Sequence, residues 1–167
     1  EGARRVIVKA PSKLPYVLLA YRAPKITHPE ADWEPYALEV LGRVLDGHDA
    51  ARLTANLVRG SRIATSASAG YSAFARGPAL FMLAATPSEA RTVADVEAAL
   101  KSEVHRVASE GVREDELARV KAQVVSSEVY ARDSMFAQAR QIGELESIGF
   151  SHRTMDVRLR RLREVTA

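Results

Sequence analysis

Four short stretches of the chain carry hydrophobic patterns that are typical of β-strands. Arg4–Ala10 alternates weakly between apolar and polar residues, and Arg62–Tyr71 alternates with small and β-branched residues. Tyr16–Ala23 and Pro78–Thr86 are apolar runs whose length suits buried strands better than helices. The connections within each pair of stretches are short, which predicts a mainly antiparallel sheet.

The remaining segments repeat apolar residues at helical spacing. Asp32 is expected to cap a helix that ends at Gly47, and a short second helix is expected to follow Asp49 and end near Gly60. Later helices are expected from Pro87 to about Ser109, from Arg113 to about Arg132, from Asp133 or Ser134 to Gly149, and from Ser151 or Thr154 onward. The predicted order is β-β-α-α-β-β-α-α-α. It indicates an α+β sandwich, with helices on one face of an antiparallel sheet.

Composition narrows the class of protein. A length of 167 residues suits one domain, residues 1–167, with a sizeable core. The net charge is only +3, and the basic residues are interleaved with acids, which is typical of a solvated surface and argues against nucleic-acid binding. No apolar run approaches the roughly 20 residues that a membrane span needs. The sequence begins with Glu1, so we expect a domain excised from a longer precursor.

The residues that most often carry catalysis are poorly placed in this sequence. The four histidines are scattered, and none lies three or four residues from another; they are His28, His48, His105 and His152. There is no His-x-x-Glu-His or His-Glu-x-x-His motif, no cysteine and no Gly-x-Ser-x-Gly elbow. We therefore predict no catalytic residue, no metal site and no cofactor in this segment.

The turn-rich stretch Leu45–Thr86 gathers four arginines, Arg52, Arg59, Arg62 and Arg76. They could be the solvated ends of helices and strands, since arginine side chains readily extend into water. Alternatively, Arg59 or Arg62 could face a cavity and hold a peptide carbonyl or carboxylate. Tyr71 could line the same cavity or pack in the core, and spacing alone leaves both interpretations open.

Several motifs occur in a fixed order along the chain. They are Tyr16–Pro24, Ala51-Arg52-Leu53 with Leu57-Val58-Arg59, Ile63–Ala69, Glu110–Leu117 with Lys121, and Asp133-Ser134 with Ala139 and Gly143. Together they resemble the insulinase/pitrilysin-type zinc metallopeptidase family, which includes the mitochondrial processing peptidase. They are most similar to the second, non-catalytic repeat domain of its bacterial members. The resemblance covers about Pro15–Phe150.

The resemblance implies half of a two-part shell. In the family, a catalytic domain carrying His-x-x-Glu-His and a distal Glu faces a homologous domain without metal ligands, and the two enclose a chamber for a peptide. Zinc is then expected on the partner catalytic domain, in the same chain or in a partner subunit. Arg59 matches an arginine that contacts substrate in this family. Thr65 stands where the family has a tyrosine, and it lacks the reach and acidity of a phenol.

We therefore predict a non-catalytic domain of a zinc metallopeptidase that forms half of a peptide chamber. Its expected substrate contacts are Arg59, Arg62 and Thr65. Tyr71 shares the parity of Thr65 along one strand, so the two could face the same side. The alternatives are a structural subunit that kept the fold and lost proteolysis, or an unrelated α+β peptide-binding module. The resemblance favours a periplasmic location.

Overall fold

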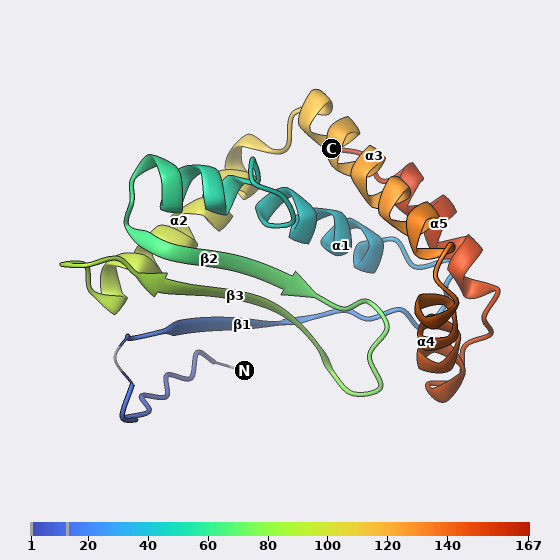
Figure 1. The fold of residues 1–167 in the computed structure, drawn as a ribbon, viewed down its shortest axis with the longest axis horizontal. Helices are drawn as coiled ribbons and strands as arrows, with labels where there is room; N and C mark the ends of the chain where they lie inside the picture. The colour runs from blue at the N-terminus through green and yellow to red at the C-terminus, as the bar shows by residue number, and fades with distance from the viewer. Residues whose placement is uncertain (1, 13) are drawn as a thin grey trace.

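The centre of the sheet is its most apolar strand, β3. The computed structural model describes residues 2–12 and 14–167. β1 (Val17–Ala23) and β2 (Ala64–Tyr71) both pair antiparallel with β3 (Ala79–Pro87), in the order β1-β3-β2 (Figure 1). Alternate residues of β3 are buried beneath the helices, as expected of a central strand: Ala79, Phe81, Leu83 and Ala85.

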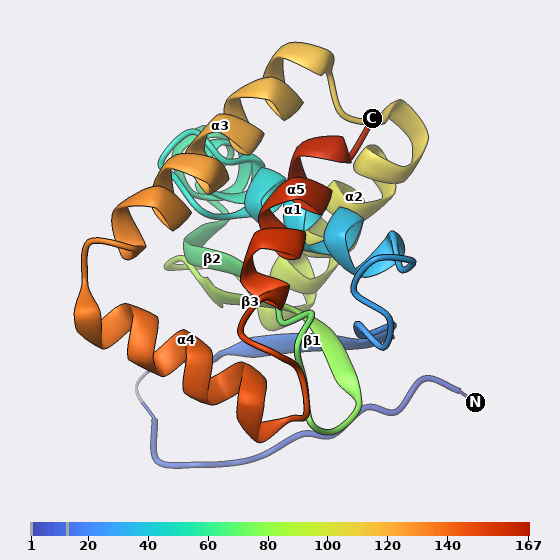
Figure 2. The ribbon, with the colours of Figure 1, turned by 90° about the vertical axis from the view of Figure 1, so that its right-hand side faces the viewer.

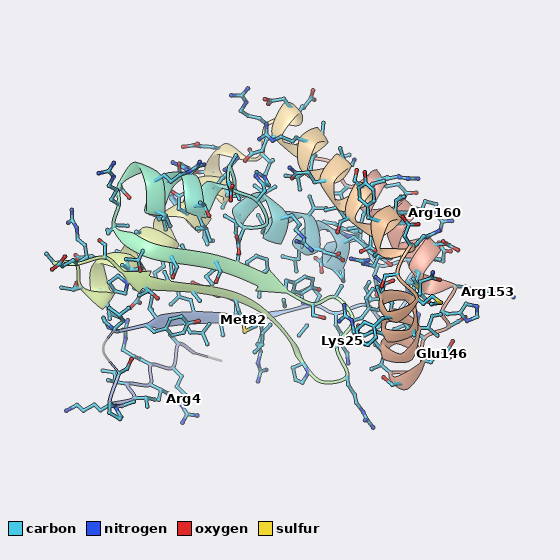
Figure 3. All side chains as sticks on the ribbon, viewed as in Figure 1. Arg4, Lys25, Met82, Glu146, Arg153 and Arg160 are labelled. Carbon is cyan, nitrogen blue, oxygen red and sulfur yellow. The ribbon has the colours of Figure 1, made fainter. Side chains whose placement is uncertain are left out.

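The helices form two layers above one face of the sheet (Figures 1 and 2). The layer on the sheet contains α1 (Glu34–Leu45), the π-helix η1 (Thr54–Gly60) and α2 (Val93–Glu110). α3 (Glu114–Ala131) and α5 (Thr154–Glu164) pack on α1, and α4 (Met135–Ser147) lies at one end of the molecule. The other face of the sheet is open, and Met82 points out of it, away from the helices (Figure 3).

Two clusters of buried side chains form the core, and α1 contributes to both. Leu45 of α1 packs with Leu83 and Leu100 in the cluster between the sheet and α2. Tyr36 and Val44, which lie on the other side of α1, belong to the cluster shared with α3 and α5. Burying one such side chain contributes about 1.5–3 kcal/mol. The periodicity of α1 therefore accounts for a helix held on two sides.

The predicted fold class is confirmed: helices cover one face of an antiparallel sheet. The first predicted strand, Arg4–Ala10, is wrong. It has no strand partner in the described chain, and Val6, Ile7 and Val8 are 67%, 79% and 80% exposed. Alternating β-branched residues supply strand propensity, but a strand also needs a neighbour to pair with. The four helices expected after the last strand are present as α2 to α5, so the predicted order string is one helix short.

Three predicted helix starts are displaced, and one is that of η1, which begins at Thr54 with no side-chain cap and does not follow Asp49 directly. Asp32 does not cap α1, because its carboxylate instead accepts the backbone N–H groups of Thr27 (2.7 Å) and His28 (2.8 Å) and closes the preceding turn. α2 begins after Thr92, whose hydroxyl accepts the N–H of Asp95 in a capping box. It does not begin at Pro87, because Pro87 is still part of β3.

A buried ion cluster fastens α5 to the helices beneath it. The Arg158 guanidinium donates to Glu39 of α1 (Nε to Oε2, 3.2 Å) and pairs with Glu128 of α3 (2.7 Å). The Arg158 side chain is only 20% exposed. Burial acts to lower the pKa of Arg158, but the adjacent carboxylates outweigh it and raise that pKa, so the guanidinium stays charged.

Replacing Arg158 with Met should lower the free energy of unfolding by about 3–5 kcal/mol, because two carboxylates lose their buried partner. Arg160→Met is the matched control. Arg160 lies on the same helix but pairs with Glu30 at the surface, so its loss should cost about 0–1 kcal/mol. Urea denaturation of both variants checks the prediction, and equal losses would show that the cluster does not hold α5.

A second ion pair joins the start of η1 to α3. Arg52 donates to both carboxylate oxygens of Glu116 (2.9 and 2.6 Å) and to the carbonyl of Gly111 (3.1 Å). Its bonds to Arg52 hold the pKa of the Glu116 carboxyl below its usual range, although burial opposes the shift. Because this pKa is lowered on folding, the pair stabilises the fold above the unfolded pKa, near 4.5, and this contribution is lost as the pH falls through the folded pKa.

Glu116→Gln should therefore unfold more easily than the unaltered protein at pH 7, with the difference shrinking as the pH falls below about 4.5. Glu114→Gln removes an exposed carboxylate from the same helical turn and serves as the control. The measurement is the free energy of unfolding by urea between pH 7 and pH 3. A gap between Glu116→Gln and the unaltered protein that stays constant over this range would contradict the linkage.

Candidate functional site

The three predicted substrate contacts lie on one exposed turn at an end of the sheet. Arg59 is in the last turn of η1, Arg62 is in the connection to β2, and Thr65 is the second residue of β2. All three side chains are exposed. We call residues 59–65 the η1–β2 turn. The structure thus brings the three residues together on a surface.

The first half of this turn is shaped by a close backbone approach. A Cβ atom at Gly60 would lie 2.9 Å from the carbonyl oxygen of Ala55, so a larger residue does not fit without a backbone shift. The next residue, Ser61, donates its N–H to the carbonyl of Asn56 at 2.8 Å, which is the five-residue spacing of a π-helix. π-turns are frequent at functional sites.

Hydrogen bonds hold the second half of the η1–β2 turn in a strained backbone conformation. Arg62 has a φ of 52°, in the left-handed region that costs a non-glycine residue of order 1 kcal/mol. Ser88 holds it there: its hydroxyl donates to the Arg62 carbonyl (2.7 Å) and its N–H to the carbonyl of Ile63 (3.0 Å). These bonds fix the backbone and leave the Arg62 side chain in solvent.

Arg59 has both a structural and an exposed component. Its guanidinium donates to the carbonyl of Asp49, which ties the loop after α1 to the end of η1. That is its one hydrogen bond among the described residues, and a guanidinium has five N–H donors. The remaining donors can face a ligand while the bond to Asp49 limits the motion of the side chain.

The odd numbering of Thr65 and Tyr71 predicts that the two side chains face the same side of β2, but the structure places them in different environments. Ala64 pairs with Pro87 and Ser66 with Thr86, so Thr65 is the extra residue of a β-bulge, which breaks the alternation. The Thr65 hydroxyl donates to the Thr86 carbonyl at 3.3 Å.

Tyr71 is a packing residue. It stacks on Phe81, with 6.1 Å between ring centroids, and its hydroxyl donates to the carbonyl of Pro24. Burial raises the pKa of Tyr71 to about 12, so it is a neutral phenol at physiological pH. Of the two interpretations that spacing left open for Tyr71, the structure favours core packing.

The other two arginines of this stretch lie elsewhere. The Arg52 guanidinium is engaged in a salt bridge with Glu116, so the role of Arg52 is structural. Arg76 lies in the loop between β2 and β3, at the opposite end of β2 from the η1–β2 turn, about 20 Å away at the rise of a strand. The four arginines therefore form no single cluster.

The residues present do not fit a zinc ion. Across residues 2–12 and 14–167, no group of three or more His, Cys, Asp or Glu side chains is arranged to hold a metal. The histidines lie in separate elements, and the side chain of His48 accepts the N–H of Ala50 (3.1 Å) while that of His152 contacts Glu146 (3.2 Å). No helix within those residues is both long and apolar enough to cross a membrane.

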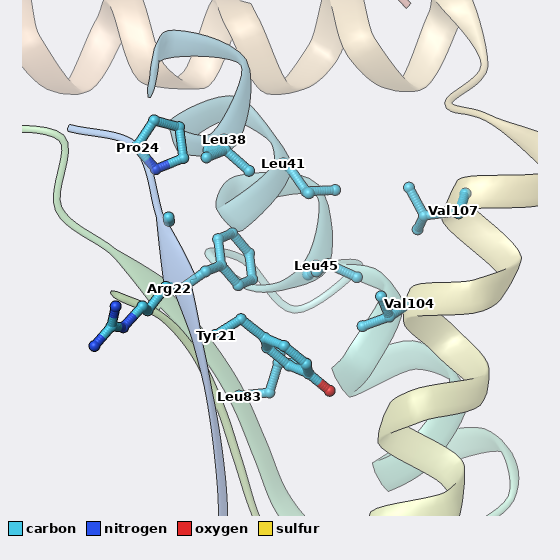
Figure 4. A pocket seen from close by; sticks show the side chains of 12 residues that line it. Tyr21, Arg22, Pro24, Leu38, Leu41, Leu45, Leu83, Val104 and Val107 are labelled. Atoms are coloured by element: carbon cyan, nitrogen blue, oxygen red, sulfur yellow. The ribbon is translucent and has the colours of Figure 1, made fainter. Parts of the chain in front are cut away.

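Two hollows that sequence analysis missed lie away from the η1–β2 turn. One is an apolar groove of about 340 Å³ between β1, α1 and α2 (Figure 4). The other is a polar cleft of about 600 Å³ between α1, α3, α4 and α5, bordered by Glu39, Glu128 and Arg158. The periodicity of the sequence identifies the residues of the groove as apolar, but it cannot show that they leave a space between them. The polar groups of the cleft come from elements too distant in sequence for spacing to connect them.

Solved structures share this fold at low sequence identity. A protease from Helicobacter pylori matches with a TM-score of 0.83 and 15% identity over 95% of this chain and 37% of its own. The inactive domain of a candidate zinc protease from Bordetella parapertussis matches with a TM-score of 0.78 and 17% identity, over 96% of this chain and 84% of its own. A peptidase M16 inactive domain from Pseudomonas fluorescens has a TM-score of 0.76 and 16% identity, over 94% and 36%.

These similarities establish the fold, and the chain spans little more than a third of the Helicobacter pylori protease. No curated protein sequence matches the chain significantly. The sequence establishes the family, because the sequence model of the peptidase M16 inactive domain matches residues 1–124, well over half of the chain. The chain therefore belongs to the peptidase M16 inactive-domain family, the non-catalytic domain of insulinase-like zinc proteases.

Proposed function

We propose that this domain forms half of a peptide chamber and contacts the substrate through the η1–β2 turn. The observation that supports this is that Arg59 and Arg62 are both exposed on one turn, where the Arg59 guanidinium is anchored on the Asp49 carbonyl and the Arg62 backbone is held by Ser88. A peptide offers carbonyl and carboxylate groups, which guanidinium groups bind through charge-assisted hydrogen bonds. The role we assign is to bind and orient a peptide, with no bond-breaking step on this chain.

The proposed partner is a homologous catalytic zinc domain, in the same chain or in a separate subunit. Its zinc would supply the hydrolytic chemistry, since the residues described here do not fit a metal. Thr65 is the weakest of the three proposed contacts, because its hydroxyl already donates to the Thr86 carbonyl. A periplasmic location belongs to the same proposal and rests on the family alone.

The alternative of a structural subunit also has an observation in its favour. Arg59 supports the loop after α1 by its bond to Asp49, and that role alone would account for its presence. A His-x-x-Glu-His motif in the neighbouring polypeptide would select the peptidase, and its absence would select the scaffold. Family membership excludes the third alternative, an unrelated α+β module.

Arg59→Ala in the complete peptidase should lower kcat/KM for peptide cleavage about tenfold or more, because a hydrogen bond to a charged group contributes about 1.5–3 kcal/mol. Arg76→Ala is the matched control, since it removes an exposed arginine at the other end of β2. Thermal unfolding of both variants separates binding from folding. Unchanged cleavage by folded Arg59→Ala would contradict the proposed contact.

Arg62→Gly and Arg62→Ala separate strain from binding at one position. Glycine adopts a φ of 52° at little cost, so Arg62→Gly should be about 1 kcal/mol more stable than Arg62→Ala. Both variants should raise KM for the peptide to a similar extent, because both remove the guanidinium. Urea denaturation and steady-state kinetics provide the two readouts, and a peptide KM that neither variant changes would remove Arg62 from the site.

A further inference from the structure

One edge of the sheet has no strand beside it. β1 pairs through all seven of its residues with β3, and no other strand of the described chain pairs with it. A free strand edge presents unpaired N–H and C=O groups that favour pairing with another strand.

The apolar groove opens beside this edge. Tyr21 and Ala23 of β1 line one wall, and Val104 and Val107 of α2 line another (Figure 4). The Tyr21 ring points toward α2, and its side chain remains 43% exposed. Apolar side chains from a strand added at this edge would therefore enter the groove.

The chain carries a segment suited to that place. Arg4–Ala10 has the same seven-residue length as β1 and contains the β-branched run Val6-Ile7-Val8, whose residues are 67–80% exposed. In Figure 1 this segment turns back beneath the start of β1. An exposed apolar stretch of this kind usually marks an interaction site.

Two prolines between Arg4–Ala10 and β1 limit where such a pairing can begin. Pro11 and Pro15 lack an N–H and cannot donate to a ladder, so pairing is confined to residues before and after them. Matching the two seven-residue stretches end to end places Ala10 opposite Val17. Residues directly opposite each other in an antiparallel pair share a face. Val8 then lies opposite Leu19, and Val6 lies opposite Tyr21 at the groove.

We propose that Arg4–Ala10 is a docking strand that pairs antiparallel with the free edge of β1 and closes the groove with Val6 and Val8. The structure contains the undocked form, in which Arg5 donates to both carboxylate oxygens of Glu97 on α2 (2.6 and 2.7 Å). Docking places Arg5 opposite Arg22 on the outer face, and this like-charge pair opposes docking. The bonds from Arg5 to Glu97, which we call the Glu97 clamp, therefore favour the undocked form, whereas the burial of Val6 and Val8 favours docking.

The absence of cysteine from the sequence allows a clean test by cross-linking. Val8→Cys with Leu19→Cys should form a disulfide within one chain under mild oxidation, because directly opposite residues lie 4.5–5.5 Å apart, within disulfide reach. Ile7→Cys with Leu19→Cys is the matched control, since Ile7 would face the other side of the sheet. We expect at least tenfold more intramolecular disulfide in the first variant, measured by non-reducing electrophoresis and mass spectrometry.

Adding Glu97→Gln to the first pair should accelerate cross-linking severalfold, because it weakens the clamp on Arg5. Circular dichroism of the reduced proteins confirms that each variant is folded. Equal yields from the two cysteine pairs would overturn the docking register. Disulfides found only between chains would also overturn the proposal and assign the β1 edge to a second copy. No acceleration by Glu97→Gln would overturn the role of the clamp.

Discussion

The two-sided burial of α1 is the constraint on which the rest of the structure depends. One side of the helix completes the core over the sheet, and the other forms the core beneath α3 and α5. The residue after the helix, Asp46, accepts the N–H of Ala69 in β2 at 3.1 Å, so the helix end is tied to the strand edge. Because only the loop of residues 46–53 separates α1 from η1, the position of α1 also constrains where the η1–β2 turn lies.

Features decided within one element could be predicted from the sequence, and features decided between elements could not. The three strands and the five α-helices follow from periodicity that each segment carries by itself. Arg4–Ala10 has the same local signal, but no neighbouring strand pairs with it, so it is not a strand here. The bulge at Thr65 depends on how β2 registers against β3. The ion pair of Arg158 with Glu39 joins residues 119 positions apart, which spacing cannot reveal.

Contacts between distant elements also decide which of the arginines are structural, and the sequence alone does not show them. Arg52 and Arg59 lie seven positions apart in one turn-rich stretch, and residue type gives no reason to treat them differently. Glu116, 64 positions further along the chain, pairs with Arg52 and makes it a structural residue. No acidic side chain of the described chain pairs with Arg59, so its charge remains available. The resemblance to a family motif singles out Arg59 as a candidate because the motif reflects the fold and not the local composition, and its contact with substrate stays a prediction.

The described residues form no group that could hold a metal ion, so under the proposed function this domain would act on proteolysis through where it places a peptide. Immobilising a flexible side chain on binding costs about 0.5–1.5 kcal/mol, which reduces the affinity that each contact provides. The Asp49 carbonyl partly restrains Arg59 in advance, and Ser88 holds the backbone of Arg62 at a strained φ. That strain is offset elsewhere in the fold, through the core that fixes α1 and β2. The stability of the scaffold and the affinity of the proposed site are therefore linked, because weakening the first would leave the two arginines mobile.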